Sequence, residues 1–176
     1  MADDRFDVVV IGAGPGGYVA AIRAAQLGMR TACVEVDKLG GVCNNVGCIP
    51  TKALLESANY ARRIRELGEF GIQVGEVTLD LAGAGKRAKK VAEQGARGVA
   101  YLFKKYGVEH VKGWGRLAGV GRVAVEGGDG ERVLEARNII VATGSRPKDL
   151  PILKADGDRV WNSDHAVFPP GAPESL

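Results

Sequence analysis

A glycine-rich turn directly after an apolar run is the feature that most restricts the fold of this chain. Residues 7–11 read as a buried strand, because four β-branched residues follow one another. Glycines follow at positions 12, 14 and 17, and residues 18–27 show the alanine-rich pattern of a short helix that Gly28 can end. Residues 31–35 read as the next strand. The pattern therefore predicts a β-turn-α-β unit of about thirty residues.

The three glycines have the spacing of a dinucleotide-binding turn. Gly12 permits the sharp turn, Gly14 lets the backbone approach a pyrophosphate, and Gly17 lets the helix pack on the strand. Glu35 ends the second strand 18 residues after Gly17, where a carboxylate accepts hydrogen bonds from ribose hydroxyls. Taken alone, the glycines fit an ordinary tight turn as well. The surrounding strand, helix and acid favour dinucleotide binding and leave the choice between FAD and NAD open.

Composition and charge restrict the class of protein. The chain has 176 residues, of which 45% are hydrophobic and 26% are charged, and this suits one globular domain with a core. The net charge is +3 with both signs interspersed, so no basic block favours nucleic acid. No apolar run could span a bilayer, and the N-terminus lacks the pattern of a signal peptide. We expect no membrane or nucleic-acid partner and a cytoplasmic location.

The rest of the chain predicts a three-layer α/β domain. Further strands of a parallel sheet are expected at 108–112 and 138–142. Helices are expected from residue 49 onward, packed on the sheet, and from 81 to about 106, with a loop at 37–47. Short strands separated by glycine turns predict an antiparallel meander at about 116–135, inserted into a Rossmann-like FAD/NAD(P)-binding domain.

Domain limits follow from the same pattern. Gly127 to Gly130 gives the clearest hairpin signal of the meander. From residue 147 onward the chain is irregular and rich in proline. We therefore expect a cofactor-binding domain at 1–150 and a connector at 151–176.

Cys43 and Cys48 are the second informative feature. A metal site would need further ligands, and the other candidates, Cys33 and two scattered histidines, make that interpretation improbable. Inert core thiols are a second interpretation, which the intervening asparagines and glycine disfavour. A redox dithiol is the third and the favoured one, since an odd number of cysteines argues against a structural disulfide framework.

The spacing of this pair restricts the backbone between the two thiols. In a regular α-helix, residues five apart differ by about 7.5 Å in rise alone. A disulfide needs Cα atoms closer than about 7 Å. A bonded pair therefore requires a distorted helix or a loop, and Gly47 and Pro50 supply departures from regular helix.

Residues 40–52, Gly-Gly-Val-Cys-Asn-Asn-Val-Gly-Cys-Ile-Pro-Thr-Lys, closely resemble the redox motif of the flavoprotein disulfide oxidoreductases. The likeness covers essentially the whole chain, through the glycine turn, Glu35 and the Ala-Thr-Gly-Ser-Arg-Pro run at 142–147. Ile49 and Pro50 make the motif most similar to the dihydrolipoamide dehydrogenase branch, since glutathione and mercuric reductases usually carry Val-Pro there. Thr51 departs mildly from the pattern, in which Ser is common.

The resemblance implies a route for electrons and a set of site residues. Electrons would pass from a dithiol substrate to Cys43–Cys48, then to FAD and finally to NAD. Cys48 would lie against the flavin, Cys43 would exchange with the substrate, and Lys52 would approach the flavin N5 region; a solvated helix lysine is the alternative. No metal is implied. The residues expected to bind FAD are Gly12, Gly14, Pro15, Gly17, Glu35, Gly41, Lys52, Gly115, Ala142, Thr143 and Gly144.

The family also needs parts that residues 1–176 do not contain: an NAD fingerprint, the end of the FAD site, and a dimerisation domain with a His-Glu base. Neither His110 nor His165 matches that base. We therefore expect a fragment or divided subunit, inactive alone, whose complete form is a homodimer that oxidises dihydrolipoamide on the lipoyl domain of a 2-oxo-acid dehydrogenase complex. A non-catalytic FAD-binding or thiol-redox module, another disulfide reductase and, less favoured, a plain NAD-dependent Rossmann enzyme remain alternatives.

Overall fold

The computed structural model describes residues 4–127, 130–169, 171, 173 and 175. The chain divides into two units. The first consists of Met1–Asn45 with Gln94–Arg146, and the second of Val46–Glu93 with Pro147–Leu176. The predicted domain boundary near residue 150 stays a prediction.

The first unit contains one mixed six-stranded sheet with the order β3-β2-β1-β6-β5-β4. Four strands are parallel, because β1 pairs with β2 and β6, and β2 pairs with β3. The pairs β4–β5 and β5–β6 are antiparallel. The strands are β1 (Arg5–Ile11), β2 (Thr31–Glu35), β3 (Glu109–Lys112), β4 (Trp114–Leu117), β5 (Arg122–Gly127) and β6 (Gly130–Val141).

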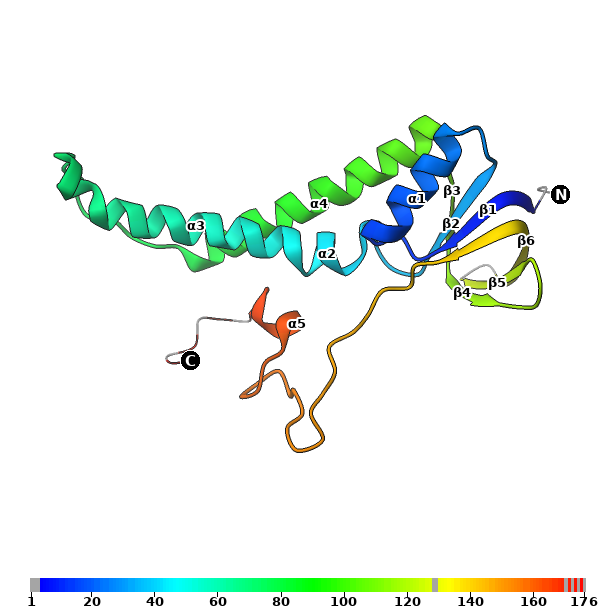
Figure 1. Cartoon of the computed structure of the whole chain (residues 1–176). Coiled ribbons are helices and arrows are strands. Elements are labelled where there is room, and N and C mark those ends of the chain that lie inside the picture. Colours follow the sequence, from blue (N-terminus) through cyan, green and yellow to red (C-terminus); the bar gives the residue numbers. More distant parts are fainter. Residues whose placement is uncertain (1–3, 128–129, 170, 172, 174, 176) are drawn as a thin grey trace. The chain divides into compact units, whose positions relative to one another are not determined.

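Strand β6 belongs to both the parallel sheet and the meander. Its residues 138–141 pair with residues 8–11 of β1, and Glu135 faces Arg5 of β1 on one side and Arg122 of β5 on the other. Figure 1 shows β6 running beside β1. The sequence pattern predicted a meander that ends at about residue 135 and a separate parallel strand at 138–142, and this division is wrong. Residues 135–137 carry no glycine or proline, so nothing ends the strand between them.

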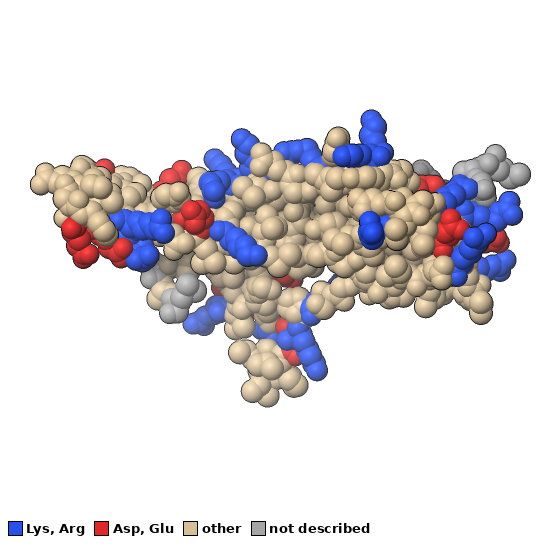
Figure 2. Space-filling model, turned by 45° about the horizontal axis from the view of Figure 1, so that its top comes forward, with Lys and Arg blue, Asp and Glu red and all other residues tan. Residues whose placement is uncertain are grey.

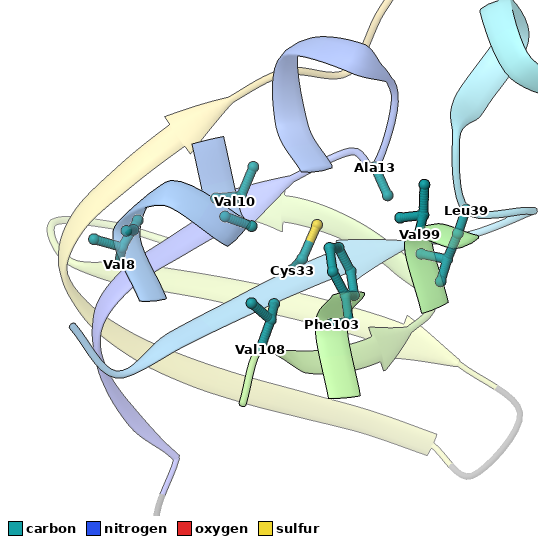
Figure 3. Packing of buried hydrophobic residues seen from close by; sticks show 10 residues of the cluster. Val8, Val10, Ala13, Cys33, Leu39, Val99, Phe103 and Val108 are labelled. Atoms are coloured by element: carbon teal, nitrogen blue, oxygen red, sulfur yellow. The ribbon is translucent and has the colours of Figure 1, made fainter. Parts of the chain in front are cut away.

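Helices cover one face of the parallel strands. The covering elements are α1 (Pro15–Gln26) and the part of α4 (Leu81–Tyr106) that lies in the first unit. Val8 and Val10 point toward them, because alternate residues of a strand face the same side. Figure 3 shows how Val99 and Phe103 of α4 lie in this cluster with Cys33 of β2. The helix expected near Pro50 lies in the second unit, and its packing on the sheet stays a prediction.

The meander covers the other face. Val9, Ile11 and Val34 of the parallel strands pack there with Val123 and Leu134 of the meander. The first unit therefore has the three layers that the sequence predicts: helices, parallel sheet and antiparallel strands. Gly127 pairs with Gly130 as expected for a hairpin, and the two residues between them lie outside the described residues.

Gly17 allows the close approach of α1 to the turn below it. A Cβ at this position would lie 1.8 Å from the Gly12 carbonyl oxygen. We expect Gly17→Ala to lower the free energy of unfolding by about 2 kcal/mol or more, because the backbone must shift to relieve the overlap. Gly16→Ala is the matched control, since no atom lies within 4 Å of a Cβ there. Urea unfolding of both variants measures the effect, and equal midpoints would contradict it.

The second unit contains α3 (Cys48–Glu66), the 3-10 turn η1 (Leu67–Phe70), the first part of α4 and α5 (Ser163–Ala166). The Arg87 guanidinium donates to the Ala53 carbonyl oxygen at 2.9 Å and so ties α4 to α3. The sequence pattern predicted no helix at α5, which lies in the segment expected to be irregular. Its start is capped reciprocally: the Asn162 side chain accepts from the Asp164 amide, and His165 Nδ1 accepts from the Asn162 amide.

Charged side chains of both signs are mixed on the surface. On the visible face of Figure 2, Lys and Arg lie beside Asp and Glu. Arg116 pairs with Glu126 and Glu131 at 2.9 and 2.8 Å. Exposed pairs of this kind contribute little to stability. Within the described part of the chain, no helix combines the length and apolarity needed to cross a membrane.

Candidate functional site

The glycine turn lies at the carboxyl ends of three parallel strands. The Gly12 amide donates to the Val34 carbonyl of β2, and the Ala142 amide, just after β6, donates to the Ile11 carbonyl of β1, both at 2.8 Å. Gly12 has a φ of +100°, and a Cβ there would lie 2.3 Å from the Ala142 oxygen. Only glycine fits this crossing. Open α/β sheets bind their ligands at this end of the strands.

Gly14 differs from the other two glycines of the motif. Its φ is −68°, and no atom lies within 4 Å of the position that a Cβ would occupy. Packing within the chain therefore does not require glycine here. Gly14 is the N-cap of α1, Pro15 follows within the first turn, and no side chain caps the helix. The start of α1 thus has no side-chain cap and has open space beside Gly14, and an uncapped helix start is a suitable place for an anion.

The carboxylate of Glu35 is anchored beside this turn. One oxygen accepts from the Ala13 amide at 2.7 Å, and the other accepts from the Asp37 amide at 2.9 Å. The Glu35 carbonyl accepts from the Gly113 amide at 3.0 Å and so links β2 to the start of the meander. The backbone contacts hold the acid at the end of β2, where the sequence analysis expected a ribose acceptor.

The loop before the cysteines lies against the glycine turn. The Gly40 amide donates to the Ala13 carbonyl at 2.8 Å. Gly41 has a φ of +59°, and a Cβ there would lie 2.6 Å from Gly14 Cα. The structure therefore brings Gly12, Gly14, Glu35, Gly41 and Ala142 together in the first unit.

The backbone between the two cysteines is interrupted, as the spacing argument requires. Cys43 is half-buried in α2 (Gly41–Asn45), a short helix within the predicted loop, and Cys48 is the exposed first residue of α3. Gly47 between them has φ −125° and ψ −114°, which is not helical. Neither cysteine forms a disulfide in this structure. Thr51 closes the first turn of α3, where its hydroxyl donates to the Gly47 carbonyl at 2.7 Å.

The remaining residues expected to bind FAD differ in whether packing within the chain accounts for the residue type at each position. Gly115 lies in β4, where a Cβ would meet Ile11 and Val34 at 3.0 Å, so packing alone accounts for glycine there. Gly144 has a φ of +76° and an exposed position after β6. Lys52 is exposed on α3 in the second unit. Roles of Gly115, Thr143, Gly144 and Lys52 toward a cofactor stay predictions.

Cys33 and the histidines have other surroundings. Cys33 is fully buried in β2, and burial, with a smaller effect of Glu35, raises the pKa of its thiol to about 12. Burial lowers the pKa of His110, whose ring meets the edge of Phe103. His165 is the reciprocal cap of α5. Among the described residues, no group of three or more His, Cys, Asp or Glu could hold a metal ion.

Burial of Cys33 has a consequence for the pH dependence of stability. In the unfolded chain the thiol loses its proton near its ordinary pKa of 9.0, whereas in the folded chain it keeps it up to about pH 12. This contribution to stability is complete below pH 9.0 and is lost as the pH rises toward 12. The unfolding free energy should fall by up to about 1.4 kcal/mol per pH unit in that window.

Urea unfolding at pH 8 to 11 measures this loss. Cys33→Ala is the comparison, because it removes this thiol and leaves every other ionisable group of the chain in place. We expect a shallower decline in the variant, and equal slopes would contradict the assignment. In the folded chain at pH 8, iodoacetamide should modify Cys48 and leave Cys33 untouched.

Known proteins resemble this chain over nearly its whole length. The sequence profile of the family described as "Pyridine nucleotide-disulphide oxidoreductase" matches residues 6–175. The dihydrolipoyl dehydrogenases of Chlorobaculum parvum and Bacillus subtilis are 49% and 45% identical to it over 98% of this chain. The mitochondrial dihydrolipoyl dehydrogenase of Canis lupus familiaris is 41% identical over 97%.

The match covers a much smaller share of each relative than of this chain. The chain spans 37%, 38% and 34% of their respective lengths. The crystal structure of LpdA from Mycobacterium tuberculosis superposes with a TM-score of 0.79 at 27% identity, and the match covers 89% of this chain and 35% of that one. The fold is thus the Rossmann-like fold expected from the sequence. With the profile matched from residue 6 to 175, the chain belongs to the pyridine nucleotide-disulphide oxidoreductase family.

Proposed function

We propose that this chain is the FAD-binding and dithiol-bearing part of a dihydrolipoamide dehydrogenase. The observation that carries the proposal is Gly14: the chain has a glycine where its own packing leaves free space, at the uncapped start of α1. A ligand pressed against the backbone explains that glycine, and an ordinary tight turn does not. Relatives named dihydrolipoyl dehydrogenase, 41–49% identical, support the choice of activity.

The residues around the turn suit the adenosine diphosphate half of FAD. The backbone N–H groups of Gly14 and Gly16 at the start of α1 would receive the pyrophosphate, because the helix end is positive there, and Pro15, which has no N–H, would fix the first turn. The anchored carboxylate of Glu35 would accept from ribose hydroxyls. Gly41 leaves the approach to Gly14 clear. The bound flavin would supply a two-electron acceptor. Gly12 and Gly17 would shape the turn, and Lys52, Gly115, Ala142, Thr143 and Gly144 would complete this chain's share.

The two cysteines would carry out thiol–disulfide exchange with the substrate. The dithiol gives up two electrons and two protons and closes to a cyclic disulfide, while the Cys43–Cys48 disulfide opens to two thiols. We assign the exchange with substrate to Cys43 and the position against the flavin to Cys48. Transfer of the electrons to NAD, a homodimer, and docking of a lipoyl domain belong to this proposal for the complete enzyme.

A chimera tests the proposal. Residues 1–176 would replace the matching part of the Chlorobaculum parvum relative, and NAD reduction would be measured with dihydrolipoamide and, separately, with reduced glutathione. We expect turnover with dihydrolipoamide only, and none in a control chimera that carries Cys48→Ser. Turnover with glutathione instead would favour another disulfide reductase. A folded chimera that takes up FAD but reduces no NAD would favour a non-catalytic module.

A further inference from the structure

The side chain of Asn45 joins the cysteine turn to the loop that contacts the dinucleotide turn. Its amide nitrogen donates to the Gly41 carbonyl at 2.9 Å and to the Leu39 carbonyl at 3.1 Å, with the Lys38 carbonyl at 3.5 Å. Three carbonyl oxygens around one nitrogen leave no place for an acceptor there. The position therefore selects an amide donor.

Asn44 fixes the orientation of that amide. The Asn44 amide nitrogen donates to the Asn45 side-chain oxygen at 3.3 Å, which turns the Asn45 nitrogen toward the carbonyls. Asn44 is 8% exposed and fits a notch in which two glycines leave room. A Cβ at Gly40 would lie 2.6 Å from Asn44 Cβ, and one at Gly95 would lie 2.0 Å from its side-chain oxygen.

These contacts form a continuous path from the turn to the thiol. The Gly40 amide is bonded to the Ala13 carbonyl, and Gly41 lies against Gly14. The Asn45 side chain then donates to the Leu39 and Gly41 carbonyls. Asn45 lies in α2, the short helix that also carries Cys43. Every residue of this path lies in the first unit. We propose that Asn45 is a positioning residue that holds Cys43 on the dinucleotide turn and thereby sets the redox equilibrium of the Cys43–Cys48 pair. The proposal rests on the redox role of that pair.

The physical reason is preorganisation. If the loop is already ordered before the disulfide closes, closing the disulfide loses less conformational entropy of Cys43. Formation of the disulfide is therefore favoured. Asn45→Asp keeps the size of the side chain and replaces the donor by an oxygen that faces carbonyl oxygens. Asn45→Ala removes the donor without that repulsion. Asn59→Asp is the charge control, because Asn59 is exposed on α3.

The test is the equilibrium of the pair with glutathione in the full chain. One oxidised glutathione takes two electrons and two protons from the two thiols, which yields the Cys43–Cys48 disulfide and two reduced glutathiones. Alkylation under denaturing conditions and peptide mass spectrometry count each cysteine separately. We expect the constant for disulfide formation to fall about tenfold in Asn45→Asp and less in Asn45→Ala, which is the size of one or two hydrogen bonds lost. Asn59→Asp should match the wild type.

The outcomes separate the two proposals. An unchanged constant in both Asn45 variants overturns the positioning role, even if their thermal midpoints fall, because a merely structural residue would give that result. A lowered constant with thermal midpoints close to the wild type supports it. A wild-type chain in which Cys43 and Cys48 form no disulfide overturns the proposed function itself, and the positioning role with it.

Discussion

Gly14→Val should remove FAD from the complete enzyme and leave the protein folded. The Cβ of a residue here meets no atom of the chain within 4 Å, and φ is −68°, so the backbone suits a branched side chain. Loss of a glycine N-cap costs on the order of 1 kcal/mol or less. A branched side chain would, however, occupy the space that the pyrophosphate needs. We expect flavin absorbance per protein to fall to background while the circular dichroism is unchanged.

A matched alanine pair controls for the loss of glycine itself. Gly14→Ala should weaken flavin retention in the chimera, while Gly16→Ala should keep it, although both positions are open in the chain. Gly17→Ala behaves differently, because it disturbs the fold before any ligand is considered. Full retention of flavin in Gly14→Val would show that this glycine serves only the turn, and the proposed cofactor site would then be wrong.

The elements that the sequence predicted well carry strong local signals. The bounds of β2 and α4 agree with the prediction, because both depend on local features. An apolar run with Glu35 at its end gives β2, and Asp80 before the helix and Gly107 after it give the ends of α4. Strand β6 was divided and α5 was missed for the opposite reason. β6 is continuous because it pairs with β1 and β5 at once, and α5 depends on one reciprocal cap in a proline-rich segment.

The candidate site shows the same division. The roles of Gly12 and Gly17 follow from their spacing in the sequence. The structure adds the backbone carbonyl oxygens that a Cβ at either position would overlap. The hydrogen bond from the Ala13 amide to Glu35 joins residues 22 apart, and no pattern in the sequence predicts it. Asn45 was seen only as a polar residue between two cysteines. Its function depends on three carbonyls that fold around it, which a linear pattern does not contain.

Replacing either cysteine should abolish turnover with dihydrolipoamide, yet the two variants should differ in their spectra. Each of Cys43→Ser and Cys48→Ser removes half of the exchangeable disulfide, so the rate should fall on the order of 10⁴-fold or more. The surroundings of the two thiols are unlike. Cys43 is half-buried in α2, Cys48 is exposed at the start of α3, and the non-helical Gly47 lies between them.

This difference leads to an asymmetric spectroscopic expectation. Only the variant that keeps Cys48 should show a long-wavelength absorption band from a thiolate beside the flavin, because we assign that sulfur to the flavin side. Spectra of the flavin-loaded chimeras with Cys43→Ser and Cys48→Ser measure it, and Cys33→Ala, whose thiol is buried in the core, serves as the control that should keep turnover. A band in Cys48→Ser and none in Cys43→Ser would reverse the two roles. Turnover retained in both variants would mean that the pair is not the redox centre, and the chemistry would then have to lie in another part of the complete enzyme.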